Sequence, residues 1–156
     1  MTDPVSTLTL RLTASPSRDF PVVTILVNGA EPFASTHLSQ GGGFPPTELL
    51  GEESPLLPLP HLGRRVAVIT CGCGFGGCGV AAPVIQLSAD GRRVSWIDFR
   101  DYVGVFVRPV YDGVGGLEDI DGQPLDVADV VFDAEQYLAE VRRASEDGSW
   151  RPATRD

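Results

Sequence analysis

The strongest constraint on the fold is a hairpin pattern between residues 80 and 99. Two runs rich in apolar and β-branched residues flank the dipeptide Asp90-Gly91, a pair typical of a two-residue β-hairpin turn. With this turn, four cross-strand pairs are expected: Leu87 with Val94, Gln86 with Ser95, Ile85 with Trp96, and Val84 with Ile97. The pattern therefore predicts two neighbouring antiparallel strands.

Further strands are expected on both sides of this hairpin. Leucines alternate with polar residues over 8–12, and apolar runs follow at 22–27, 66–71 and 103–110. The run at 22–27 ends at Asn28-Gly29, which accepts positive φ at both positions and predicts a type I′ turn. Pro32 limits the return strand to a short or edge segment.

Glycine and proline interrupt the rest of the chain, with 18 and 13 copies among 156 residues. Residues 35–63 have no consistent period, so we expect an irregular segment there with a short helical turn at 47–50. Residues 112–129 are rich in acids and glycine and are expected to form an acidic surface excursion.

A helix is expected to begin after Asp133. Asp133 is a good N-cap, Gln136 completes a capping-box-like pair, and Phe132 and Tyr137 occupy the positions of a hydrophobic staple. The apolar residues that follow at helical spacing are Ala134, Tyr137, Leu138, Val141 and Ala144. This pattern predicts an amphipathic helix of about three turns.

These elements predict one α+β domain over residues 1–150, followed by a disordered tail at 151–156. The domain is expected to hold an antiparallel sheet of about five to seven strands, with the C-terminal helix packed on a face. A chain of this length is long enough to bury one core.

The charge of the chain is unevenly distributed. The formal net charge is −9, and eleven acids against only Arg142 and Arg143 lie between residues 112 and 147. Because phosphate backbones require a cationic surface, this balance counts against nucleic-acid binding. An acidic C-terminal third fits either general solubility or a basic protein partner. The candidate partner-binding residues are Asp119, Asp121, Asp126 and Asp129.

The location of the protein is expected to be the cytoplasm. No run of apolar residues is long enough for a membrane-spanning helix. The first residues lack the basic and apolar regions of a signal peptide. In the cytoplasm, thiols stay reduced unless they are catalytic or bound to a metal.

All three cysteines lie in one short turn, with the spacing C-x-C-x4-C at Cys71, Cys73 and Cys78. Three thiolates in such a turn could hold Zn²⁺ if His61 or His37 supplied a fourth ligand. A Cys73–Cys78 disulfide would instead serve a thiol-redox role. The third interpretation, which the spacing favours, is a glycine-shaped turn whose cysteines pack as small apolar side chains.

The same turn matches the dinucleotide-binding pattern G-x-G-x-x-G at residues 72–77. That fingerprint requires a helix to begin at the glycines. Pro83 would break such a helix, and the hairpin at Asp90-Gly91 leaves no room for a crossover. The match is therefore interpreted as accidental. Catalytic constellations are scarce, which favours a non-enzymatic protein.

Three separated motifs follow one another in order: C-x-C-G-x-x-G-C over 71–78, V-x-W-x-x-F over 94–99, and F-D-x-x-Q-Y over 132–137. In this the chain resembles a group of short, uncharacterised proteins from GC-rich bacteria, over roughly residues 65–145. The use of arginine for every basic residue fits such a genome. The group often carries an aromatic residue after the third cysteine, where this chain has Gly79. The resemblance implies a stand-alone small domain and no particular activity.

These observations favour a non-enzymatic protein-interaction module, which would bind through the acidic C-terminal third or the face around residues 35–63. The alternative is a zinc-binding or thiol-redox protein that uses Cys71, Cys73 and Cys78. A third hypothesis is a small-molecule pocket lined by Trp96, Phe99 and arginines such as Arg92, Arg93, Arg100 and Arg108.

Elemental analysis of the protein purified without chelators separates the interpretations of the cysteine turn. Zinc at one equivalent per chain is expected only if the thiolates are ligands, because structural zinc requires a closed ligand set. Absence of metal, together with cysteines that resist alkylation until the chain unfolds, would leave the packing role alone.

Overall fold

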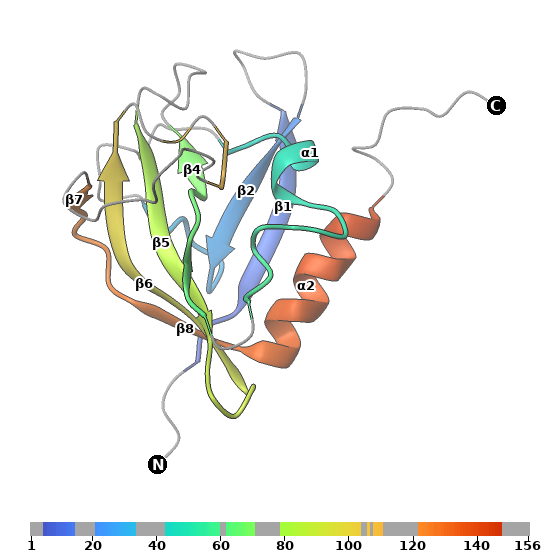
Figure 1. Cartoon of the computed structure of the whole chain (residues 1–156). Helices are drawn as coiled ribbons and strands as arrows, with labels where there is room; N and C mark the ends of the chain where they lie inside the picture. The colour runs from blue at the N-terminus through green and yellow to red at the C-terminus, as the bar shows by residue number, and fades with distance from the viewer. Residues whose placement is uncertain are drawn as a thin grey trace.

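A computed structural model of the chain is shown in Figure 1. The structure describes residues 5–14, 21–33, 43–59, 62–70, 79–103, 106, 108–110 and 122–147. No helix in these ranges is long and apolar enough to cross a membrane.

The fold is α+β, as the sequence predicts. In chain order the elements are β1 (Leu8–Ala14), β2 (Pro21–Val27), α1 (Pro46–Leu49), β3 (Arg64–Arg65), β4 (Ile69–Thr70), β5 (Val80–Leu87), β6 (Arg93–Tyr102), β7 (Gln123–Pro124), β8 (Val130–Asp133) and α2 (Ala134–Glu146).

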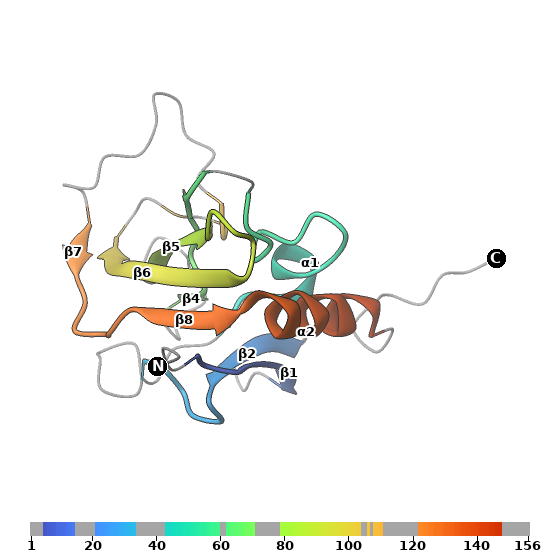
Figure 2. The same ribbon diagram turned by 90° about the horizontal axis from the view of Figure 1, so that it is seen from below.

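Six of these strands form an antiparallel sheet around the β5–β6 hairpin. β3 and β4 pair with β5, and β7 and β8 pair with β6. β1 and β2 form a separate two-stranded sheet. Figure 2 shows this small sheet opposite β5 and β6, with α2 following β8 along one side. The predicted sheet with a C-terminal helix packed on it is confirmed.

The central hairpin has the predicted register but a different turn. All four expected cross-strand pairs are present. The chain reverses over residues 89–92, because the Asp90 carboxylate accepts hydrogen bonds from the Ser88 hydroxyl and the Arg92 amide. Within residues 89–92, only Gly91 takes a positive φ, +73°. This local carboxylate bonding favours a four-residue turn over the two-residue one.

The hairpin contains a β-bulge that the sequence analysis did not anticipate. The pairing with β6 shifts between Ala82 and Val84. The Pro83 carbonyl between them accepts the Val66 N–H at 3.0 Å, so the side of Pro83 that lacks an N–H faces away from β6. Opposite this shift, Asp98 takes a φ of +52°, a conformation uncommon for a residue other than glycine. The Asp129 carboxylate accepts the Asp98 N–H at 3.1 Å. The extra residue of the bulge therefore lies on β6, where the contact with Asp129 holds it.

Other expected strands differ from the structure. The run 66–71 is not one strand: β3 and β4 flank Val66, which forms an isolated bridge with Val110. Within 103–110, Val110 in this bridge is the only described residue with β pairing. β7 and β8 lie in segments expected to be loop or helix start. These short pairings depend on β5 and β6, so the local pattern does not reveal them.

Local predictions at one turn and at one helix start are confirmed. Asn28 and Gly29 have φ values of +54° and +80°, as a type I′ turn requires. Before α2, the Asp133 carboxylate accepts the Gln136 N–H at 3.0 Å, and the rings of Phe132 and Tyr137 pack with centroids 5.1 Å apart. The Gln136 side chain turns away from the cap and binds Leu8 instead.

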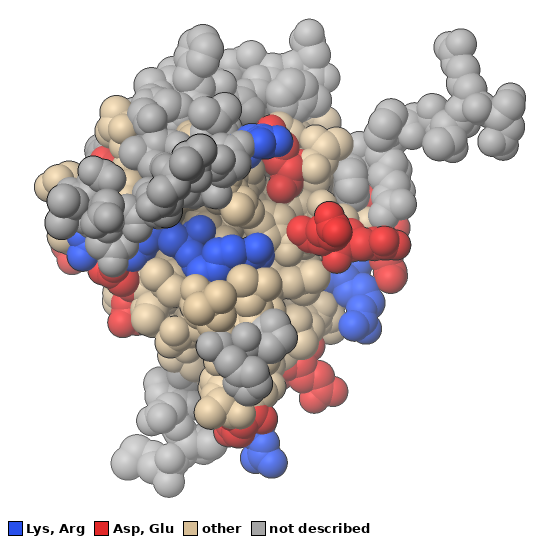
Figure 3. Space-filling view, viewed as in Figure 1, with Lys and Arg blue, Asp and Glu red and all other residues tan. Residues whose placement is uncertain are grey.

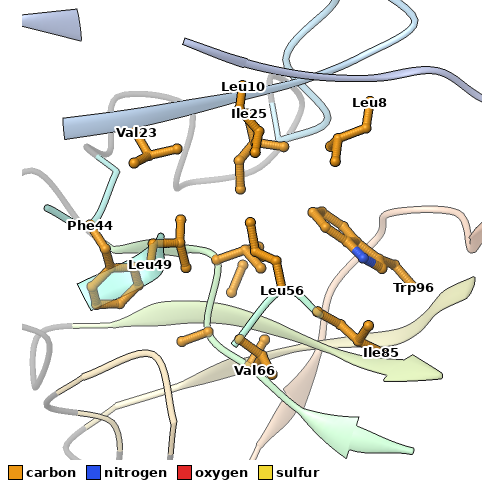
Figure 4. Packing of buried hydrophobic residues seen from close by; sticks show 14 of the residues in the cluster. Leu8, Leu10, Val23, Ile25, Phe44, Leu49, Leu56, Val66, Ile85 and Trp96 are labelled. Atoms are coloured by element: carbon orange, nitrogen blue, oxygen red, sulfur yellow. The ribbon is translucent and has the colours of Figure 1, made fainter. Parts of the chain in front are cut away.

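The core lies between the two sheets and α2 (Figure 4). Buried side chains from β1 and β2 point toward Leu56, Ile85 and Trp96. Trp96 packs edge-on against Phe99, Phe132 and Tyr137. Trp96 and Phe99 belong to this core, and neither lines the two grooves found among the described residues.

One buried hydroxyl links three elements of this core. Trp96 Nε1 donates to the Tyr137 hydroxyl at 3.0 Å, and the hydroxyl donates to the Leu56 carbonyl. Both Trp96 and Tyr137 are fully buried, and burial raises the pKa of the Tyr137 hydroxyl. β6, α2 and the segment after α1 are therefore joined at one atom.

Replacement of Tyr137 by phenylalanine tests this link. The Tyr137→Phe variant is expected to lose about 1–3 kcal/mol of unfolding free energy, because a buried N–H and a buried carbonyl lose their partner. Urea unfolding measures this loss, and amide exchange should also become faster in residues 54–57. A loss below about 0.5 kcal/mol would contradict the assigned role.

Candidate functional site

The candidate metal ligands lie outside the described residues. This holds for Cys71, Cys73, Cys78 and His61, and also for His37. The strand residues on either side of the cysteine turn are described: Thr70 pairs with Val80, and its hydroxyl donates to the Gly79 carbonyl at 3.4 Å. Within the described ranges, no group of three or more His, Cys, Asp or Glu side chains could hold a metal ion.

Two of the four candidate acids are described. Asp126 and Asp129 are both exposed, and the Asp129 carboxylate accepts the backbone N–H of the bulge residue Asp98. Asp129 therefore has a structural contact. Asp119 and Asp121 lie outside the described residues.

Two arginines of the six-stranded sheet, Arg65 and Arg100, are engaged in structural bonds. Arg65, 6% exposed, donates to the Asp98 carboxylate at 2.7 Å and to the carbonyls of Ala82 and Asp98. Arg100 donates to the same carboxylate and to the Gly122 carbonyl. Hydrogen bonds from Arg100 and Arg65 hold the pKa of Asp98 below its usual range. This cluster stabilises the bulge.

A groove runs between α2 and the segment after α1. It has a volume of about 360 Å³, and we call it the acidic groove. Its apolar wall is formed by Leu57, Leu138 and Val141. Glu52, Arg142 and Glu146, all exposed, also line it. The two surfaces that the sequence analysis singled out, the acidic C-terminal third and the face around 35–63, meet here.

Hydrogen bonds hold the segment that forms one wall of this groove. Gly51, which has a φ of +113°, turns the chain and donates its N–H to the Ser145 hydroxyl of α2 at 2.9 Å. The buried Ser54 hydroxyl donates to the Leu49 carbonyl and accepts from the Leu56 N–H. Together with the bond from Tyr137 to Leu56, these contacts fix the wall before any partner binds.

The charged side chains around the acidic groove make no ion pair among the described residues. Glu52, Glu53, Glu146 and Arg142 have no ion pair with any described residue. Figure 3 shows acidic side chains gathered over the loop after α1 and the adjacent end of α2. The groove thus presents apolar surface beside carboxylates that remain open to a cation.

A second groove, of about 680 Å³, lies between α2 and β1, and we call it the strand groove. Here polar side chains of α2 bind the outer edge of β1. The Gln136 carboxamide pairs with both the N–H and the carbonyl of Leu8. Glu140 accepts the Leu10 N–H at 2.8 Å, and Arg143 donates to the Leu10 carbonyl at 2.8 Å. These side chains take the place of a neighbouring strand.

The ion pair of this edge is partly shielded from water. Arg143 Nε lies 2.8 Å from Glu140 Oε1, and the Glu140 side chain is 13% exposed. Burial raises the pKa of Glu140, but hydrogen bonds from Arg143 and Leu10 outweigh it and hold the pKa below its usual value of 4.5. The charged carboxylate therefore stabilises the fold.

The sequence analysis named Leu138, Val141 and Ala144 only as the apolar stripe of the helix, and it assigned no residue to a groove. Leu57 and Glu52 lie in a segment without a period, and Gln136 was interpreted as part of a capping box. The one usable signal was the helical stripe Gln136, Glu140, Arg143, whose spacing places these polar residues on one side of α2. Their partners on β1 are about 130 residues away in sequence.

Comparisons of the chain with protein-family models, with curated proteins and with solved structures find no match.

The Glu140 carboxylate gives stability a defined pH dependence. Glu140→Gln is expected to lower the unfolding free energy at pH 7 by about 0.5–2 kcal/mol, since the charge-assisted bonds are weakened. Because the pKa of Glu140 is depressed by folding, its contribution is present above pH 4.5 and is lost as the pH falls through the lower folded value. The difference between the parent and the variant should therefore shrink in acid.

Urea unfolding at pH 7 and pH 3 measures this difference. Glu53→Gln is the matched control, because Glu53 is exposed and has no bond to a described residue. A loss for Glu140→Gln that is equal at both pH values would show that the carboxylate charge does not stabilise this edge.

Proposed function

We propose that the domain is a protein-interaction module that binds a basic segment of a partner protein in the acidic groove. The observation that carries the proposal is the preformed apolar wall of Leu57, Leu138 and Val141 beside the unpaired carboxylates of Glu52 and Glu146. Such a surface fits a segment with an apolar side chain next to arginine or lysine.

The apolar wall supports binding of a single anchoring side chain. Leu57 and Leu138 are half-buried, so each still exposes apolar surface toward the groove. Full burial of one leucine-sized side chain contributes about 1.5–3 kcal/mol. Because the wall is already held by Ser54, Ser145 and Tyr137, little ordering entropy is lost there on binding.

The charge of the chain supports the choice of a basic partner. The formal net charge is −9, so a cationic segment is attracted from a distance and the association rate depends on ionic strength. Arg142 at the rim adds selectivity, since a partner cation placed beside it is repelled. A basic residue is therefore best accommodated on the side of Glu52 and Glu146.

The cysteine hypotheses and the cytoplasmic location stay predictions. The described residues include no cysteine and no histidine, so the structure bears on neither zinc binding nor thiol chemistry. The elemental analysis proposed above tests the metal alternative independently of the groove.

A labelled peptide tests the proposed function. The probe is a fluorescein-labelled peptide with one leucine between two pairs of arginines, measured by fluorescence anisotropy at low and high salt. The parent chain is expected to bind it, and Glu52→Lys combined with Glu146→Lys to weaken binding at least tenfold, because both attractive carboxylates become repulsive. Raised salt should weaken binding to the parent chain.

Two controls separate the groove from general electrostatics. Glu31→Lys changes the charge of an exposed site outside the groove and is expected to alter affinity less than twofold. A peptide in which glycine replaces the leucine should bind more weakly than the probe. Equal binding by the parent and the double variant, or no effect of the leucine, would refute the assigned groove.

A further inference from the structure

The outer edge of β1 is only partly covered by α2. Inward and outward peptide groups alternate along a strand. Thr7 bonds to Asn28 across the hairpin, whereas Leu8 and Leu10 bond outward to α2. By this alternation, the N–H and carbonyl of Leu12 also face outward.

No described group pairs with the outward N–H and carbonyl of Leu12. Side chains of α2 take the place of a neighbouring strand only at Leu8 and Leu10. Arg143, which bonds to Leu10, is the last of these side chains along α2. Leu12 lines the strand groove. The position is therefore an open hydrogen-bonding site on a strand edge, which is the feature that strand addition uses.

Apolar side chains line the groove beside this open edge. Val23 and Leu50 are buried, Leu12 is half-buried, and Ala144 of α2 contributes to the opposite wall. In an added antiparallel strand, the residue opposite Leu12 would point to the same face as Leu12, toward this lining. An apolar side chain fits at that position.

The neighbouring Arg11 supplies a charge preference. Arg11 is exposed, lines the strand groove and has no ion pair with any described residue. In the added strand, one neighbour of the apolar residue would lie directly opposite Arg11 and point to the same face of the sheet as Arg11. Opposite charges across a strand pair are favourable, so a glutamate or aspartate fits there.

We infer that the strand groove binds an extended acidic–apolar peptide of a partner protein, which adds to the outer edge of β1 at Leu12. The backbone of this peptide exchanges hydrogen bonds with Leu12, its apolar residue enters the lining by Val23 and Leu50, and its carboxylate pairs with Arg11. This site is independent of the acidic groove, and neither depends on the other being occupied.

Synthetic pentapeptides test the inference on the full chain. The probe has a central valine between two glutamates, with a threonine at each end, and its matched control has lysines in place of the glutamates. The parent chain is expected to bind the glutamate peptide at least tenfold more tightly than the lysine peptide. In an amide NMR titration, the Leu12 N–H should shift among the most strongly perturbed signals.

Two changes isolate the charge and the backbone contacts. Arg11→Glu alters an exposed side chain, and it is expected to reverse the preference between the two peptides. A glutamate peptide with an N-methylated valine lacks the donor to the Leu12 carbonyl and is expected to bind at least tenfold more weakly. Retained preference in Arg11→Glu, equal binding of the methylated peptide, or an unperturbed Leu12 signal would each overturn the inference.

Sedimentation of the free chain tests a second copy as the occupant. A monomer at the concentrations of the titration is the expected result. A dimer that Arg11→Glu dissociates would assign the edge to a second copy of this chain and overturn the peptide assignment.

Discussion

The Tyr137 hydroxyl is the contact on which the arrangement of this protein depends. It receives a hydrogen bond from Trp96 on β6 and gives one to the Leu56 carbonyl. Neither partner has access to water at this depth. Without the hydroxyl, the indole N–H and the Leu56 carbonyl would stay unsatisfied, and the fold would lose stability. The helix, the main sheet and the segment after α1 are therefore held in one geometry. The acidic groove forms between two of these three elements.

The second organising feature is the polar stripe of α2. A helix beside an exposed strand edge normally buries apolar residues against it, but here Gln136, Glu140 and Arg143 bond to the peptide groups of β1. These bonds attach the small sheet to the helix and block most of the β1 edge. The same helix contributes one wall to each groove, with Leu138 and Val141 in the acidic groove and Ala144 in the strand groove. Its two sides thus offer surfaces of different chemistry.

Most predictions based on nearest neighbours in sequence hold in the structure, although the predicted two-residue turn at Asp90-Gly91 is a four-residue turn. The hairpin register from Leu87 to Val94, the turn at Asn28 and Gly29, and the N-cap at Asp133 each depend on residues within a few positions. Predictions that required knowledge of a distant partner fail. Within the run 66–71, Val66 forms a bridge to the distant Val110 between β3 and β4, and β8 forms by pairing with β6. For the candidate site, the sequence analysis named the acidic C-terminal third and the segment 35–63, both of which contribute residues to the acidic groove, but the named acids Asp126 and Asp129 do not line it. It assigned no residue to a groove.

The amino-acid sequence by itself determined the fold class, the register of the central hairpin, the turn at Asn28 and Gly29 and the start of the last helix, because short-range sterics and hydrogen bonds decide these features. Tertiary structure decided the rest. The bulge at Asp98 lies opposite the shift between Ala82 and Val84, and Arg65, from a third strand, and Asp129 both bind it. Gln136 binds Leu8 because the fold brings the β1 edge to α2. A polar side chain can bond to several groups. Packing decides which unsatisfied peptide group lies within its reach, and the side chain bonds to that group.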